Sequence, residues 1–98
     1  MGLGLLSRIA RRFGICWTEC GARTSGPISK GKRVLIRKHS EVTADGGGIS
    51  LGNDVVIDSH AILRTYGGAI KIGDRVVVNP FCMLYGHGGL TIEDDVLI

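Results

Sequence analysis

Aliphatic residues recur with a period of six in this 98-residue chain, from residue 30 to the end. Written in coils, the sequence reads KGKRVLIRKHSEVTADGGGIS, then LGNDVVIDSHAILRTYGGAIK, then IGDRVVVNPFCMLYGHGGLT, then IEDDVLI. The coils begin at Lys30, Leu51, Ile72 and Ile92, so their spacings are 21, 21 and 20 residues. Each complete coil holds three six-residue units followed by two or three extra residues. This internal repeat restricts the fold more than any other feature of the chain.

The first position of a six-residue unit is aliphatic in ten of the eleven units, whereas about three or four would be expected by chance. An amphipathic helix has an apolar stripe every three to four residues and does not fit this period. Short strands joined by tight corners do fit, with three strands to a triangular coil and coils paired ~4.8 Å apart. The alternation of a strand then predicts that Val76 and Val78 point inward and Val77 outward.

Tight corners are also expected from the glycines. Sixteen glycines with two prolines and five aromatic residues favour short apolar strands and turns over a helical bundle. The extra residues of each coil follow a glycine pair, where we expect positive φ or a close approach of two backbones. Asp54, Asp74 and Asp94 recur near the third or fourth position of a unit and are interpreted as corner residues. The glycine pairs are Gly46-Gly47, Gly67-Gly68 and Gly88-Gly89.

The repeat, an aliphatic residue, a glycine or acid, two free positions and a small residue, resembles the left-handed parallel β-helix of hexapeptide-repeat acyltransferases. The handedness is implied by this resemblance, because general rules for parallel crossovers favour right-handed connections. The predicted fold is therefore an all-β, left-handed parallel β-helix with a short N-terminal helix. Residues 1–28 are assigned to a basic amphipathic helix and linker, and residues 29–98 to the β-helix, with about three and a third coils.

The N-terminal segment lies outside the repeat, and its pattern predicts a short amphipathic helix that ends near Gly14. Two interpretations stay open: the helix caps the end of the β-helix, or it contacts anionic lipid or a partner as a peripheral membrane segment. Its apolar positions are Leu3, Leu5, Leu6, Ile9 and Phe13, and its basic positions are Arg8, Arg11 and Arg12.

Charge divides the chain into two parts. Residues 1–40 hold nine Lys and Arg but one acid, Glu19, whereas residues 41–98 hold three basic residues and eight acids. The basic residues lack interleaved stacking aromatics, so no nucleic-acid partner is expected. Three cysteines, an odd number, without a signal-peptide pattern indicate a reducing compartment. We expect a cytoplasmic protein, with contact to the inner face of the membrane left open.

The segment from Ile72 to Ile98 is similar to the sugar O-acetyltransferase branch, which includes maltose and galactoside acetyltransferases and enzymes that modify bacterial polysaccharides. This resemblance implies an acyl-CoA-dependent O-acyltransferase with acetyl-CoA as donor, a carbohydrate acceptor and a homotrimer with the donor in a groove between subunits. It implies no metal cofactor. It also assigns Asn79, Tyr85 and His87 to the substrate site, with His87 in the place of an acceptor-binding aspartate.

A histidine serves as general base on the acceptor hydroxyl in this family, since its pKa suits proton transfer near neutral pH. The resemblance places that histidine beyond Ile98, so the chain is expected to be an N-terminal fragment or a truncated enzyme. Two further interpretations of His87 stay open: it is the catalytic base itself, or it is a corner residue without chemistry. The alternative function is a catalytically inactive truncated β-helix that serves oligomerisation or ligand binding.

His39 and His60 occupy the same position of adjacent coils, and Phe81 follows in the next one. We therefore expect the three side chains to stack on one face. The γ-class carbonic anhydrases share the fold and bind zinc through three histidines, but their closely spaced histidine pair is missing here. The histidine column is accordingly not expected to hold a metal.

Overall fold

The computed structural model describes residues 16–98, which form twelve short strands joined by turns. The strands are β1 (Trp17–Thr18), β2 (Arg23–Ser25), β3 (Ile28–Lys30), β4 (Leu35–Ile36), β5 (Glu41–Thr43), β6 (Ile49–Leu51), β7 (Val56–Ile57), β8 (Ile62–Arg64), β9 (Ile70–Ile72), β10 (Val77–Val78), β11 (Met83–Tyr85) and β12 (Leu90–Ile92). The pairings between these strands are parallel and join strands of neighbouring coils.

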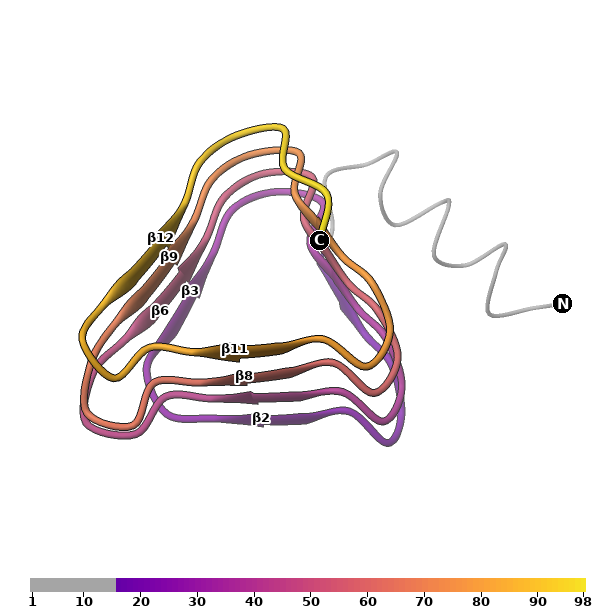
Figure 1. The fold of residues 1–98 in the computed structure, drawn as a ribbon. Coiled ribbons are helices and arrows are strands. Elements are labelled where there is room, and N and C mark those ends of the chain that lie inside the picture. Colours follow the sequence, from indigo (N-terminus) through magenta and orange to yellow (C-terminus); the bar gives the residue numbers. More distant parts are fainter. Residues whose placement is uncertain (1–15) are drawn as a thin grey trace, which may run out of the picture.

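The strands form three sheets, and each sheet is one side of a triangular solenoid of about four coils (Figure 1). Sheet A contains β1, β4, β7 and β10; sheet B contains β2, β5, β8 and β11; sheet C contains β3, β6, β9 and β12. In Figure 1 the last coil is nearest the viewer, and the chain runs clockwise from β11 through β12 toward its C-terminus. A coil that turns clockwise while approaching the viewer is left-handed, as the resemblance implied.

The register of the coils confirms the repeat and extends it toward the N-terminus. Ile49 pairs with Ile70 at a separation of 21 residues, but Trp17 pairs with Leu35 at a separation of 18. Eighteen residues are three six-residue units without an insertion. The later coils have their extra residues between sheets B and C. Strands of the solenoid are therefore present from Trp17 onward, so residues 17–28 of the segment assigned to a helix and linker belong to it.

Aliphatic side chains fill the interior of the triangle, as the first positions of the units predicted. Val76 and Val78 are fully buried while Val77 is only half-buried, which confirms the inward and outward alternation. Burial of such side chains is the dominant stabilising contribution of the fold. The buried apolar residues are Val34, Leu35, Ile36, Val42, Ala44, Ile49, Leu51, Val55, Ile57, Ala61, Leu63, Ile70, Ile72, Val76 and Val78.

The glycine pairs lie at the corner between sheets B and C, which we call the B–C corner (residues 44–48, 65–69 and 86–89). Gly46, Gly67 and Gly89 have φ of 84°, 91° and 93°, as expected for residues that need the left-handed region. Gly68 meets the second expectation, because a Cβ there would collide with the carbonyl oxygen of Gly86. Both predictions about these corners are confirmed.

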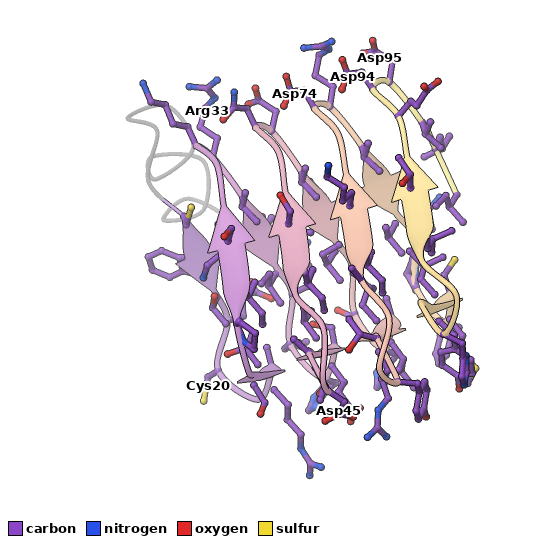
Figure 2. The ribbon with its side chains drawn as sticks, turned by 90° about the vertical axis from the view of Figure 1, so that its left-hand side faces the viewer. Cys20, Arg33, Asp45, Asp74, Asp94 and Asp95 are labelled. Carbon is purple, nitrogen blue, oxygen red and sulfur yellow. The ribbon has the colours of Figure 1, made fainter. Side chains whose placement is uncertain are left out.

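Acidic and amide side chains line the corner between sheets C and A, which we call the C–A corner (residues 31–34, 52–55, 73–76 and 93–96). The side-chain oxygen of Asp74 accepts a hydrogen bond from the Asn53 N–H at 2.8 Å, and that of Asp94 accepts one from the Asp74 N–H at 2.7 Å. Asp54 adopts φ of 59° there. Figure 2 shows part of this row along one edge of the solenoid. The interpretation of Asp54, Asp74 and Asp94 as corner residues is confirmed.

The predicted N-terminal helix is the part of the fold that needs correction. Residues 16–98 contain strands and turns but no helix, and the stretch after Cys16 forms β1 and β2 instead of a linker. The sequence missed these strands because Thr18 and Thr24 stand where later coils have aliphatic residues. The segment from Leu3 to Gly14, on which the helix was predicted, lies outside the described residues.

Candidate functional site

The B–C corner carries a cluster of exposed rings formed by Tyr66, Tyr85 and His87. Tyr85 ends β11, His87 follows two residues later, and Tyr66 lies at the same corner one coil earlier. The rings of Tyr66 and His87 are stacked, with centroids 4.7 Å apart and planes at 9°. Tyr85 meets both rings edge-on, at 5.1 Å from Tyr66 and 5.9 Å from His87. The structure therefore brings together two of the three predicted site residues, Tyr85 and His87.

Arg64 extends this cluster toward the preceding coil. Its guanidinium carbon lies 4.8 Å from the centroid of the Tyr66 ring, within the range of a cation–π contact. Its Nη2 donates a hydrogen bond to Asp45 Oδ2 at 3.2 Å, and its Nε lies 3.5 Å from Glu41 Oε2. The hydrogen bond with Asp45 raises the pKa of Arg64 despite partial desolvation. The carboxylates of Asp45 and Glu41 thus hold the Arg64 guanidinium in place over the Tyr66 ring.

Asn79, the third predicted site residue, lies at a different corner. It follows β10 and belongs to the corner between sheets A and B, which we call the A–B corner (residues 19–22, 37–40, 58–61 and 79–82). Its N–H donates to the carbonyl oxygen of Ile98 at 3.0 Å. His87 follows β11, so one side of the triangle, on the order of 17–20 Å of extended chain, separates the two residues. Asn79 and His87 of one chain do not share a site.

The A–B corner carries the predicted column of His39, His60 and Phe81, which is confirmed. The centroids are 5.2 Å apart for the two histidines and 5.0 Å apart for His60 and Phe81, and both pairs are stacked. A shallow pocket lies beside the column, over the outward face of sheet B. Within residues 16–98, no group of three or more His, Cys, Asp or Glu side chains is arranged to hold a metal ion. The pocket is lined by Gly21, Arg23, His39, Ser40, Glu41, His60, Ile62, Phe81 and Met83.

The cysteines are free thiols in three different environments. Cys16 donates to the carbonyl oxygen of Gly31 at 3.1 Å, Cys82 packs against the core, and Cys20 is exposed. Figure 2 shows Cys20 at the lower edge of the solenoid, away from the labelled acidic residues of the C–A corner.

Sequence reasoning missed Tyr66 and Arg64, although the repeat contained the signal. Asp45, Tyr66 and His87 are 21 residues apart, which places them at one corner of successive coils. The histidine column at the A–B corner was found by this same alignment. The site prediction at the B–C corner used only the motif of the last complete coil, which contains Tyr85 and His87. It did not compare that coil with the preceding one, which contains Arg64 and Tyr66.

Comparison with known proteins gave no match: no family model, no curated protein and no solved structure matches the chain significantly. Among residues 16–98, no helix is long and apolar enough to cross a membrane. The relation to acyltransferases therefore stays a prediction from the hexapeptide coils and from the residues of the Ile72–Ile98 segment.

Proposed function

We propose that this protein is an acyl-CoA-dependent O-acyltransferase that transfers an acetyl group to a hydroxyl of a sugar or polysaccharide precursor. The observation that carries the proposal is the pairing of Tyr85 and His87 at an exposed corner of a hexapeptide solenoid. An aromatic side chain offers an apolar face to a sugar ring, and an imidazole offers a hydrogen-bonding group to its hydroxyls. Both groups are accessible, and both stand where the resemblance puts the acceptor.

The reaction needs no covalent acyl-enzyme. The acceptor oxygen attacks the thioester carbonyl, a C–O bond forms, the C–S bond breaks, and the hydroxyl proton passes through a histidine to the leaving thiolate. Orientation of the two substrates supplies much of the rate enhancement in such a ternary complex. His87 serves this reaction by binding the acceptor hydroxyl, and a neutral imidazole there can also accept its proton.

Two copies of the chain complete the site in this proposal. Asn79 and His87 lie at opposite ends of β11, so they meet only when the A–B corner of one copy lies against the B–C corner of the next. A homotrimer with sheet B turned toward its threefold axis brings these corners together at each of its interfaces. Phe81 and Met83, which are 75% and 61% exposed, supply apolar surface on that side.

The same apolar surface favours the second candidate, a non-catalytic β-helix that serves oligomerisation. Exposed aromatic and aliphatic side chains promote association whether or not the assembly performs chemistry. Transfer activity separates the two candidates, since the second one predicts assembly without any transfer.

The test is an acetyl-transfer assay with purified protein, acetyl-CoA and a panel of mono- and oligosaccharides, read by mass spectrometry of the acceptor. We expect His87→Ala to lower kcat/KM at least about tenfold, and about a hundredfold or more in kcat if His87 is the base. Ser50→Ala, on the outward polar face of sheet C, is the matched control and should retain full activity. Absence of transfer to every acceptor would contradict the proposal and favour the non-catalytic candidate.

A further inference from the structure

Tyr66 has a backbone conformation that bulky residues rarely adopt. Its φ is 46°, in the left-handed region, and it is followed by Gly67 with φ of 91°. A tyrosine at positive φ costs free energy that the surrounding structure must offset. The equivalent residues of the neighbouring coils, Asp45 and His87, have no positive φ. Among the non-glycine residues of the B–C corner, positive φ is therefore found at Tyr66 alone, although His39, His60 and Phe81 adopt it at the A–B corner.

The Tyr66 ring is surrounded by contacts on its faces and its edge. Arg64 places its guanidinium over the ring at 4.8 Å, and His87 of the next coil stacks on the ring at 4.7 Å. Tyr85 packs against it edge-on at 5.1 Å. Arg64 is in turn held by Asp45 of the preceding coil. The contacts of Tyr66 with Arg64, Tyr85 and His87 all involve its ring. Among the described residues, none forms a hydrogen bond with the Tyr66 hydroxyl.

We propose that Tyr66 is a positioning residue that fixes the imidazole of His87 in the acceptor site. The Tyr66 ring stacks on the imidazole and keeps the two planes nearly parallel, and Tyr85 packs edge-on against both rings. The imidazole edge is thereby directed along the exposed corner, where a sugar hydroxyl is expected to bind. This role rests on the proposed function, because a fixed orientation of the His87 imidazole matters only if His87 binds the acceptor.

The decisive variants are Tyr66→Phe and Tyr66→Asn. Phenylalanine keeps the ring and loses only the hydroxyl, whereas asparagine tolerates the left-handed region but has no ring. Comparing them separates the stacking contact from the backbone conformation. The readouts are the imidazole proton signals of His87 by NMR and the KM values for acceptor and acetyl-CoA.

In the wild type and in Tyr66→Phe, the signals of His87 should show the upfield shift of a proton near an aromatic face, and the acceptor KM should agree within about twofold. In Tyr66→Asn, the His87 signals should move toward those of an unstacked imidazole, and the acceptor KM should rise roughly tenfold with the acetyl-CoA KM unchanged. His39 and His60, stacked at the A–B corner, are internal controls whose signals should stay in place if the variant is folded.

Unchanged His87 signals in Tyr66→Asn would overturn the positioning role, whatever the activity of the protein. Shifted signals with an unchanged acceptor KM would overturn it as well, because the order of His87 would then not matter to the acceptor. If the wild type transfers no acyl group, the proposed function fails. The NMR comparison, with binding of the sugar panel in place of KM, then still decides whether Tyr66 fixes His87.

Discussion

At the scale of single residues, Glu19 pairs a buried carboxylate with the basic first part of the chain. It is the only acid among the first forty residues, and in the structure it is almost fully buried. Its Oε1 accepts hydrogen bonds from Arg37 Nε at 2.9 Å and from the Lys38 N–H at 3.0 Å. Burial opposes ionisation of this carboxyl, but these hydrogen bonds outweigh burial and lower the pKa of Glu19. Glu19 thereby ties the first coil to the second.

A pH-dependent contribution to stability follows from this lowered pKa. The unfolded chain binds a proton at Glu19 more readily than the folded one, so the contribution is complete above the ordinary Glu pKa of about 4.3 and is lost as pH falls through the lower folded value. We expect Glu19→Gln to lower the free energy of unfolding by about 1–3 kcal/mol at pH 7. Urea unfolding across pH 3 to 7 checks this, and a difference between wild type and variant that grows toward acid would contradict it.

At the scale of elements, the period of six was enough to predict the strands from residue 30 onward and the stacking of their corners. Aliphatic residues such as Leu63 and Val78 point inward because burial of apolar area drives folding, and the aliphatic pattern can be read from the sequence alone. The first coil escaped prediction because Thr18 and Thr24 lie in its aliphatic positions. Both threonines are exposed in the structure, so neither of them fills the aliphatic interior.

The site was less predictable than the strands. Tyr85 and His87 could be found by resemblance, but their contact with Tyr66 depends on the alignment of coils at a corner that contains an insertion. The separation of Asn79 from His87 likewise depends on which corner each residue occupies. The sequence motif of one coil contains both residues, but it does not show that they lie at different corners of the triangle.

The B–C corner offers a test of its close backbone packing. A Cβ on Gly68 would collide with backbone of the next coil, whereas a Cβ on Gly88 meets no atom within 4 Å. We expect Gly68→Ala to lower the free energy of unfolding by at least about 2 kcal/mol and Gly88→Ala to change it by less than about 0.5 kcal/mol. Chemical denaturation of the two variants provides the measurement. Equal effects would contradict this difference in packing between two coils of the same corner.

At the scale of the whole molecule, the three sides of the solenoid differ in character. Sheet C presents Ser29, Ser50, Lys71 and Thr91 outward, a polar surface suited to solvent. The far end of sheet B and its corners present exposed apolar and aromatic side chains instead. This asymmetry is what an assembly with sheet B turned inward requires, and it would join the corner of Asn79 to the corner of His87 in a neighbouring copy.

In the proposed function two copies form each acyl-transfer site, and subunit mixing tests this arrangement most directly. Asn79→Ala and His87→Ala are each expected to retain at most about a tenth of the wild-type activity alone in the acetyl-transfer assay. Unfolded and refolded together in equal amounts, they should regain roughly a quarter of the wild-type activity, because random mixing around a closed ring leaves about that share of interfaces with both residues intact. A mixture as inactive as either variant alone would contradict the account.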